Sequence, residues 1–584
     1  MARVAVDVPA LADQGRELDY RVPPSLVDVV TVGSFVRVPL HGRRVAGWVV
    51  ALDVDPPAGV VLAPITTWSS HGPDPELVAL ARWAAWRWAG RATAMLRAAT
   101  PLHNVRSLPP RPASAAVRAK GGAEPARLAR EALAAGEAVI RLPPAADALA
   151  AVGELLRVGP GLVITPSVDG ASAAAQMLRA TGAPVALVPE GWARAAAGGV
   201  TVVGARAAAW APAPDARVVV VLDAHDQSLI EERAPSWSAW LVAAERARRL
   251  GVPCVLITSC PTLEQLRWGS LVLPDRTTER LGWAVTEVDD RRAADPRTGL
   301  LSERLVPILR GATMAGRVLC VLNRKGRVRL LRCRTCGQLA LCEHCAGPMA
   351  IEQDSEGLVC GRCGRARPAL CQACGGAALR VLRTGVSRVR EELEAVARLP
   401  VGEVTAEVDA MPSTPVLVGT EALLRRVGAG EAAAVAFLDF DSELLAPRYR
   451  AREDALVLLA RASRAVGGRG EGRVIVQTRQ PDHVVLDAAV RADPGRLAEL
   501  ELAQREELEL PPFRALDELS GDAEVVAGVA ESLAARVEVL GPTDGRWLAR
   551  APDHQRLCDA LAAVGRPVGA GNQVLRIDVD PQRL

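Results

Sequence analysis

Four Cys-x-x-Cys pairs between residues 333 and 374 constrain the fold of this chain more than any other feature of its sequence. They use eight of its twelve cysteines: Cys333/Cys336, Cys342/Cys345, Cys360/Cys363 and Cys371/Cys374. This spacing forms a tight turn, or knuckle, whose two thiolates face one ion, and tetrahedral Zn²⁺ takes four such ligands. Two knuckles therefore close one site, and four predict two structural zinc ions. Spacing alone leaves open which pairs share an ion.

The surroundings of these pairs favour metal over a disulfide or a redox dithiol. A glycine follows three of the pairs, after Cys336, Cys363 and Cys374, as a tight turn requires. The N-terminus has no basic segment leading into an apolar one, and we find no apolar run long enough to span a membrane. We therefore expect a cytoplasmic protein, and in that reducing compartment clustered thiols bind metal. A closed Cys₄ site leaves no position for water, so neither zinc should be catalytic.

Length and charge restrict the function less. A chain of 584 residues is expected to form several domains. Its formal net charge of +3 does not identify a nucleic-acid-binding protein, because any basic footprint would have to be local. Nearly every basic residue is arginine, the only lysines being Lys120 and Lys325, which indicates a GC-rich genome more than a function.

The run VLNRKGRVRLLRCRTCG…CEHC…LVCGRCG…CQACGG…TGVSRVREELE closely resembles the zinc-bearing part of the primosomal protein N′ (PriA) family. These are bacterial replication restart proteins built on a superfamily 2 DNA helicase. Near the start, LDYRVP and VGSFVRVPLHGRRVAGWVV resemble the family's 3′-end-binding domain, and ITSCPTLEQ, VLVGTEALL, LPPF and IDVDP follow in the family's order. The chain is thus similar to a divergent, actinobacterial-type member. In the family the outer pairs share one zinc and the inner pairs the other, which implies zinc 1 on Cys333, Cys336, Cys371 and Cys374, and zinc 2 on Cys342, Cys345, Cys360 and Cys363.

The resemblance implies a multidomain α/β fold with a β-rich N-terminal domain, two RecA-like lobes, a double Cys₄ zinc insertion in lobe two and a small α+β C-terminal domain. The family's winged helix is expected to be absent, because only a short Pro-, Ala- and Arg-rich stretch follows the N-terminal domain. The predicted boundaries are 1–104 for the 3′-DNA-end-binding-like domain with its helical tail, 105–125 for a linker, 126–310 for a degenerate lobe 1, 311–332 and 377–510 for lobe 2, 333–376 for the zinc insertion, and 511–584 for the C-terminal domain.

The nucleotide-binding motifs of such a helicase are missing. A phosphate loop, G-x-x-x-x-G-K-[ST], holds phosphate through backbone N–H groups and a lysine. At its place this chain reads AVIRLPPAADALAAVGELL, a predicted strand, turn and helix, in which Pro143 and Pro144 have no N–H to donate. The family's D-E-E-H motif is replaced by Leu222, Asp223, Ala224 and His225, and leucine cannot bind Mg²⁺. We expect no nucleotide-binding and no catalytic residues.

A third element, the arginine-bearing segment of lobe two, is also altered. ARASRAVGGRGEG keeps Arg464 but lacks the second arginine of the family's pattern, unless Arg469 takes its place. An arginine finger without a nucleotide has no charge to stabilise. Three separate losses predict a pseudo-helicase without ATP as a cofactor.

The N-terminal domain is the remaining candidate for specific DNA recognition. By resemblance, Asp19 and Gly42 match positions of the family's pocket for a 3′-terminal nucleotide, whereas the lysine expected near residue 63 is missing. A carboxylate can accept a hydrogen bond from a 3′-hydroxyl, and a glycine allows close backbone approach. A capping aspartate and a turn glycine are the alternative interpretation. Arg37, Arg43 and Arg44 are candidate phosphate contacts, while the tryptophans at 83, 86 and 88 fit a helix core better than base stacking.

The sequence therefore predicts a replication restart protein that binds abandoned or branched forks and single-stranded DNA and scaffolds primosome assembly. Its expected partners are primosome proteins and the replicative helicase, with no membrane contact and a nucleoid-associated location. One alternative is an ATP-dependent 3′-to-5′ helicase with a cryptic nucleotide site. Another is a protein-interaction platform with little DNA affinity.

Overall fold

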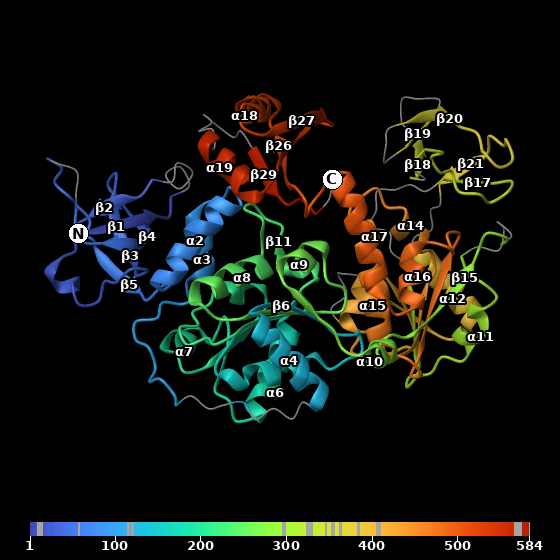
Figure 1. The fold of residues 1–584 in the computed structure, drawn as a ribbon, viewed down its shortest axis with the longest axis horizontal. Coiled ribbons are helices and arrows are strands. Elements are labelled where there is room, and N and C mark those ends of the chain that lie inside the picture. The colour runs from blue at the N-terminus through green and yellow to red at the C-terminus, as the bar shows by residue number, and fades with distance from the viewer. Residues whose placement is uncertain are drawn as a thin grey trace. The chain divides into compact units, whose positions relative to one another are not determined.

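A computed structural model describes residues 1–8, 16–55, 59–113, 117, 122–294, 300–322, 331–344, 347–351, 357–360, 365–381, 386–404, 410–565 and 575–582 (Figure 1). The chain divides into two compact units. Residues 1–141, 147–273 and 503–581 form the first, and residues 142–146, 274–502 and 582–584 form the second. Among the described residues, no helix combines the length and apolar character needed to cross a membrane.

The first unit begins with a five-stranded antiparallel sheet in the order β2-β1-β4-β3-β5. Its strands are β1 (Ala2–Val6), β2 (Leu18–Tyr20), β3 (Phe35–Leu40), β4 (Arg43–Leu52) and β5 (Thr67–Ser70). One face carries a valine-rich core that includes Val4, Val36 and Val49. On the other face Ala5 and Trp48 join the same core as helices α2 (Pro75–Arg87) and α3 (Ala92–Ala99). Alternating side chains thus bury both faces of this small sheet.

Lobe 1 is a seven-stranded parallel sheet in the order β14-β6-β13-β10-β7-β9-β8. Its strands are β6 (Glu137–Arg141), β7 (Leu162–Ile164), β8 (Val185–Leu187), β9 (Thr201–Gly204), β10 (Val219–Leu222), β13 (Cys254–Thr258) and β14 (Ser270–Val272). Short runs such as VVVL and CVLIT are buried throughout, as expected for a parallel sheet covered on both faces. The helices of this lobe include α4 (Ala123–Ala135), α5 (Ala148–Leu155), α6 (Val168–Ala180), α7 (Trp192–Ala197), α8 (Ala239–Leu250) and α9 (Leu263–Trp268).

The C-terminal part of the first unit is an antiparallel sheet in the order β27-β28-β26-β29. It consists of β26 (Ala515–Gly521), β27 (Glu538–Thr543), β28 (Arg546–Ala551) and β29 (Leu575–Val579), with helices α18 (Ala523–Ala534) and α19 (His554–Val564). Several of its buried residues, among them Leu519 and Leu557, belong to one core cluster with α2 and α3. The N-terminal helices and the C-terminal sheet therefore pack together although they lie at opposite ends of the chain.

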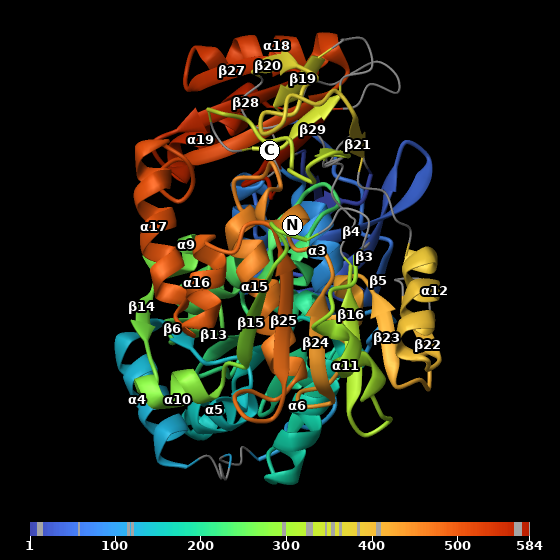
Figure 2. The ribbon, with the colours of Figure 1, turned by 90° about the vertical axis from the view of Figure 1, so that its right-hand side faces the viewer.

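Lobe 2, in the second unit, is a six-stranded parallel sheet in the order β15-β25-β24-β16-β23-β22 (Figure 2). Its strands are β15 (Val285–Asp290), β16 (Arg317–Val321), β22 (Val401–Val404), β23 (Val416–Gly419), β24 (Ala432–Phe437) and β25 (Arg473–Thr478). Its helices are α10 (Arg276–Leu281), α11 (Leu305–Arg310), α12 (Val386–Ala397), α13 (Glu421–Arg426), α14 (Asp441–Leu444), α15 (Ala451–Ala465) and α16 (Val484–Val490), with α17 (Pro494–Glu507) linking this lobe to the C-terminal sheet in sequence.

One predicted boundary needs correction. The sequence placed residues up to 310 in lobe 1, whereas β15 pairs in parallel with β25 and the second unit takes up the chain again at residue 274. The reason is that a short edge strand with the mixed sequence VTEVDD does not reveal which of two parallel sheets it joins. The multidomain α/β class, with two parallel sheets, is as predicted.

The cysteine-rich insertion contains two small sheets. Strands β17 (Leu331–Cys333) and β21 (Leu379–Val381) pair with each other, and β18 (Met349–Ile351), β19 (Gly357–Cys360) and β20 (Ala366–Pro368) form the second sheet. Leu339 of the insertion packs against Leu445, which follows α14 of lobe 2. The insertion therefore has its own framework, and Leu339 gives it an apolar contact with the lobe that carries it.

Candidate functional site

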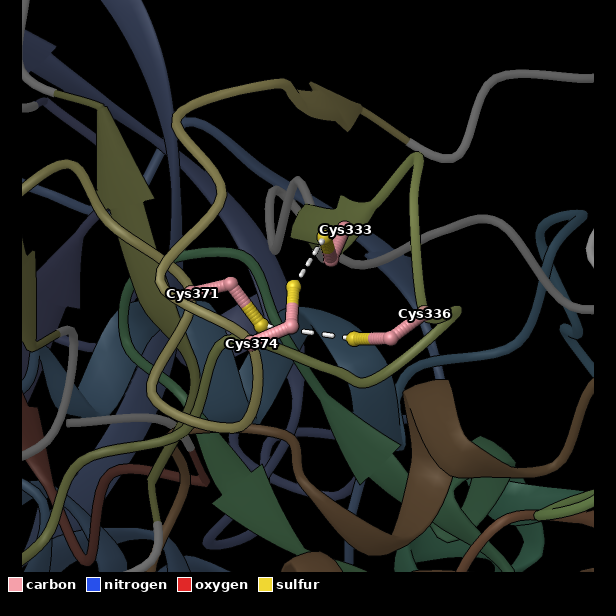
Figure 3. Close-up of side chains that lie close together, drawn as sticks. All are labelled: Cys333, Cys336, Cys371 and Cys374. Carbon is pink, nitrogen blue, oxygen red and sulfur yellow. Dashed lines mark hydrogen bonds between the residues drawn. The ribbon is translucent and has the colours of Figure 1, made fainter.

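The first and last knuckles meet although 35 residues separate Cys336 from Cys371. The Sγ atoms of Cys333, Cys336, Cys371 and Cys374 all lie within 4.8 Å of one another (Figure 3). Cys333 and Cys374 approach to 3.6 Å, and Cys336 and Cys371 to 3.5 Å. Sulfur atoms bound to one tetrahedral Zn²⁺ are about 3.8 Å apart, given a Zn–S bond of about 2.3 Å. Four thiols with this spacing could hold one metal ion, and their number and softness suit zinc.

Backbone hydrogen bonds explain why each knuckle points its thiols inward. The N–H of Cys333 donates to Gln338 O, and that of Cys371 to Gly376 O, at 2.9 Å each. Gly337 and Gly375 then donate back to Cys333 O and Cys371 O, with φ angles of +77° and +70°. A residue with a Cβ rarely adopts this left-handed conformation, which accounts for the glycine after the second cysteine of each pair.

The polarity around Cys333 favours its thiolate, the form that binds metal. Burial acts to raise the pKa of this thiol, but the N–H groups of Cys336 and Thr335, together with hydrogen bonds from the Cys374 and Cys336 thiols, lower the pKa to about 6. Backbone N–H donors act to lower the pKa of Cys336 and of Cys374 as well, but the shared thiol hydrogen bonds act the other way on these neighbours and raise the pKa of both. The Thr335 N–H donates to Cys333 Sγ at 3.4 Å. Hydrogen bonds of this kind stabilise sulfur ligands in zinc knuckles.

The two inner knuckles follow the same backbone pattern. The N–H of Cys342 donates to Gly347 O at 2.8 Å, and that of Cys360 to Arg365 O at 2.9 Å. Both cysteines are buried in one cluster with Met349, and Met349 is the strand partner of Cys360. Cys345 and Cys363, the other two predicted ligands of zinc 2, lie outside the described residues. The first cysteines of the two inner knuckles thus share one buried cluster, as a shared ion would require.

In the N-terminal domain, Asp19 lies on β2 and is held by an arginine of the neighbouring strand. Arg3 on β1 donates from Nε to Asp19 Oδ1 at 2.8 Å and from Nη2 to Asp19 Oδ2 at 3.2 Å. Arg3 and Asp19 are direct cross-strand partners, so both side chains lie on the same face of the sheet. Sequence reasoning missed Arg3, because the pairing depends on a strand register that the local pattern does not give.

The other predicted pocket residues lie near the end of β3. Gly42, with a φ of +75°, and His41 form the two-residue turn between β3 and β4, where both central residues need a positive φ. Tyr20, next to Asp19, donates its hydroxyl to Pro39 O at 3.1 Å. Arg21 bridges to Pro64, beside the position where the expected lysine is missing. These contacts bring the chain around Asp19, Gly42 and residue 63 into one region.

The three candidate phosphate-binding arginines are all exposed. Arg37 pairs with Ala46 and Arg44 with Pro39, which places both on the face of the sheet that carries Asp19. Arg43, one residue away, lies on the opposite face. The tryptophans behave as predicted for a helix core: Trp88 is buried, Trp83 packs against the same core, and Trp86 donates to Asp559 Oδ1 at 2.9 Å.

The predicted strand, turn and helix at the position of the phosphate loop are β6, residues 142–147 and α5. The N–H of Ala145 donates to Gly282 O at 3.1 Å and that of Ala146 to Pro143 O at 2.9 Å. Asp147 caps α5 by accepting from Leu149 N at 3.0 Å. These N–H groups, which would bind phosphate in a nucleotide-binding loop, are already used within the protein.

The residues at the other two nucleotide motifs also bond within the chain. Asp223 adopts a φ of +44° after β10, and His225 Nδ1 lies 2.6 Å from the Thr258 hydroxyl. Arg469, the possible substitute arginine, donates from Nε to Arg280 O at 3.3 Å.

A polar junction that the sequence did not indicate links the N-terminal helices to the C-terminal sheet. Asp580 binds Arg87 of α2 at 2.6 Å and His554 of α19 at 2.7 Å. Nearby, Ser236 donates to Asp578 Oδ1 at 2.8 Å. Burial acts against ionisation of Asp580, but Arg87 and His554 lower its pKa well below the ordinary value. The junction joins residues hundreds of positions apart and leaves no local sequence pattern.

Comparisons with protein families and with curated relatives point to one family. Residues 3–101 match the family described as the 3′DNA-binding domain (3′BD) of PriA. The chain is 31% identical to the "Probable replication restart protein PriA" of Mycobacterium bovis over 610 aligned residues, covering 95% of this chain and 90% of that protein. It is 28% identical to the "Replication restart protein PriA" of Thermotoga maritima, covering 61% of this chain and 52% of that protein. Among solved structures, S. cerevisiae Dbp5 bound to RNA and ADP BeF3 aligns with a TM-score of 0.34 and 9% identity, covering 65% of this chain and 93% of that one.

Proposed function

We propose, from the premise that this chain belongs to the family of the replication restart protein PriA, that it binds branched DNA at stalled forks and scaffolds restart without hydrolysing ATP. The match of residues 3–101 to a 3′ DNA-binding domain supports DNA as the partner. Branched or forked DNA and single-stranded DNA are the proposed ligands, and primosome proteins and the replicative helicase the proposed protein partners. The proposed location is the cytoplasm, at the nucleoid.

The loop between β6 and α5 is the observation that carries the non-hydrolysing part of this proposal. Two of its residues, Pro143 and Pro144, have no N–H, and the N–H groups of Ala145 and Ala146 donate to backbone carbonyls. The loop has no lysine to reach a phosphate. Strand β10, two places from β6 in the sheet, carries Leu222 where a carboxylate would bind Mg²⁺. Each of these features removes a different contact of the nucleotide, so restoring one would leave the others missing.

The zinc insertion is proposed to be a rigid structural module. Cys333, Cys336, Cys371 and Cys374 would hold zinc 1, and Cys342, Cys345, Cys360 and Cys363 would hold zinc 2. Zinc supplies the cross-links that so small a pair of sheets cannot obtain from an apolar core. The shared backbone pattern of the four knuckles supports this assignment.

DNA binding by the zinc-loaded full chain tests the proposal directly. We expect a branched fork to bind at least about tenfold more tightly than linear duplex of the same length, with an affinity that falls steeply as salt rises, because phosphate contacts release counterions. Fluorescence anisotropy at two salt concentrations measures both. Equally weak, salt-insensitive binding of fork and duplex would contradict the proposal and favour a protein-interaction platform.

A further inference from the structure

The bond between Arg3 and Asp19 points to a residue of the DNA-end site that the sequence did not indicate. We propose that Arg3 is a positioning and specificity residue for the 3′-terminal nucleotide: it orients the Asp19 carboxylate toward the 3′-hydroxyl and supplies the cation for the adjoining phosphodiester. This inference rests on the proposed function, because it concerns the same DNA end.

The carboxylate remains able to bind a ligand while Arg3 holds it. Each Asp19 oxygen accepts one hydrogen bond from Arg3, at 2.8 and 3.2 Å. A carboxylate oxygen has two acceptor positions, so one remains on each oxygen. The Asp19 side chain is 11% exposed, which limits access to a small group such as a hydroxyl. Two anchored oxygens fix the plane of the carboxylate before any DNA arrives, and such preorganisation favours binding.

Arg3 also keeps donors for a second group. A guanidinium has five N–H groups in a planar fork, and the two bonds to Asp19 use two of them. The Arg3 side chain is 40% exposed, so its other donors can reach a ligand beside Asp19. Arginine suits a phosphodiester because the fork can meet two phosphate oxygens at once. A terminal nucleotide carries its 3′-hydroxyl and its phosphodiester on the same sugar, which matches an acceptor and a donor on adjacent strands.

The charges around Asp19 favour Arg3, rather than another nearby residue, as the cation that binds the phosphodiester. Residue 63, which the bridge between Arg21 and Pro64 places near the end of β2, is an alanine. The acidic Glu17, two residues before Asp19, is already bound by Arg82 at 2.8 Å. A negatively charged DNA end would meet Asp19 unfavourably without a cation bound to it. Arg3 is the cation that the structure places on both of its oxygens.

Binding of two fork DNAs by four forms of the full zinc-loaded chain tests the inference. The forks differ only in a 3′-hydroxyl or a 3′-phosphate at the leading-strand end, and the proteins are the unmodified chain, Arg3→Gln, Arg3→Lys and Arg97→Gln. Arg97 forms an ion pair with Asp7, the residue after β1. Its substitution therefore removes another exposed ion pair near β1 without changing a residue of the proposed site. Thermal unfolding of each variant is recorded beside the affinities.

We expect the unmodified chain to prefer the 3′-hydroxyl fork, and Arg3→Gln to weaken that fork roughly five- to tenfold while leaving the phosphate-ended fork unchanged. The dependence of affinity on salt should fall by about one counterion for the hydroxyl fork. Arg3→Lys should keep the salt dependence and recover only part of the preference, because lysine lacks the fork geometry. Arg97→Gln should match the unmodified chain.

Three outcomes would overturn the inference alone. The first is an Arg3→Gln variant whose affinity and end preference are unchanged. The second is an equal loss of affinity for both forks in Arg3→Gln, which would indicate a general phosphate contact. The third is the same loss of affinity in Arg97→Gln, which would indicate a structural effect. If the unmodified chain bound forks without distinguishing their ends, the inference would fail while fork binding stood. If it failed to prefer forks over duplex, the proposed function itself would fail.

Discussion

Each outer zinc knuckle depends on a residue that carries no ligand atom. Gly337 and Gly375 adopt positive φ angles, which lets the backbone turn back and donate to the first cysteine of the pair. The turn aims two sulfur atoms to one side, and the pairing of β17 with β21 brings two such turns together. The geometry of the site is therefore set by backbone bonds, and a bound metal ion would close it.

Replacing one cysteine in each site should remove zinc from that site alone. We expect Cys336→Ser and Cys360→Ser each to lower the bound zinc from about two to about one equivalent, since three thiolates hold zinc much more weakly than four. Metal analysis after gel filtration measures the content. Thr335→Ala, an exposed change inside the first knuckle, is the matched control. Two equivalents retained in either cysteine variant would refute the ligand assignment.

At this scale the spacing of the cysteines predicted the eight candidate ligands, because Cys-x-x-Cys is a local pattern with a fixed chemical meaning. Spacing did not predict that the first and last pairs come together; that grouping was implied by the family resemblance, and the structure shows it for Cys333, Cys336, Cys371 and Cys374. Arg3 could not be predicted, since its partner Asp19 lies 16 residues away and the pair exists only in one strand register. Asp580 illustrates the same limit: its partner Arg87 is 493 residues away.

At the scale of elements, strand β26 carries a buried acid that shapes the stability of the C-terminal sheet. Asp517 is fully buried, and burial, followed by the negative charges of Asp578 and Asp580, raises its pKa to about 8. Between the unfolded pKa of about 3.9 and this value, the folded chain keeps a proton that the unfolded chain releases. The contribution of Asp517 to stability therefore falls as pH rises from about 4 to 8. Asp580 acts oppositely, since its lowered pKa makes stability fall only below about pH 4.

Asp517→Asn should remove this pH dependence, because the amide is neutral at every pH. We expect the melting temperature of the first unit to rise by roughly 2–5 °C at pH 8, with a smaller gain at pH 5. Thermal unfolding from pH 5 to pH 8 measures the difference. Asp544→Asn, at the turn between β27 and β28, is the control. A variant less stable than the parent at pH 8 would show that the carboxylate is charged and paired.

The elements were predictable where residue pattern and period agree. The alternation of apolar and polar residues in the N-terminal strands, and the strand, turn and helix at residues 137–155, follow from local pattern. The bond of Ala145 could not be foreseen, because the carbonyl of Gly282 comes from a distant segment. Which acceptor the Ala145 N–H finds depends on the tertiary structure. The absence of a lysine and the presence of two prolines in the loop are visible in the sequence.

At the scale of the whole molecule, the chain keeps two parallel sheets, while we propose that its nucleotide motifs have lost their chemistry. The assignment of β15 to lobe 2 shows why sequence alone misplaced a boundary: the strand VTEVDD has no continuous apolar run, and its pairing with β25 cannot be read from its own residues. Family membership and the matched 3′ DNA-binding domain are what connect this architecture to forks. The account therefore predicts a protein in which DNA binding persists and coupling to ATP is gone.

ATP turnover at a saturating concentration of branched fork DNA, with fork binding recorded in the same samples, tests this central claim most directly. The account predicts full occupancy of the fork and no ATP hydrolysis above the protein-free blank, because the loop at residues 142–147, Leu222 and the missing lysine each deny the nucleotide a contact. Turnover that rises with fork concentration and saturates together with the binding curve would contradict it and show an active nucleotide site in this chain.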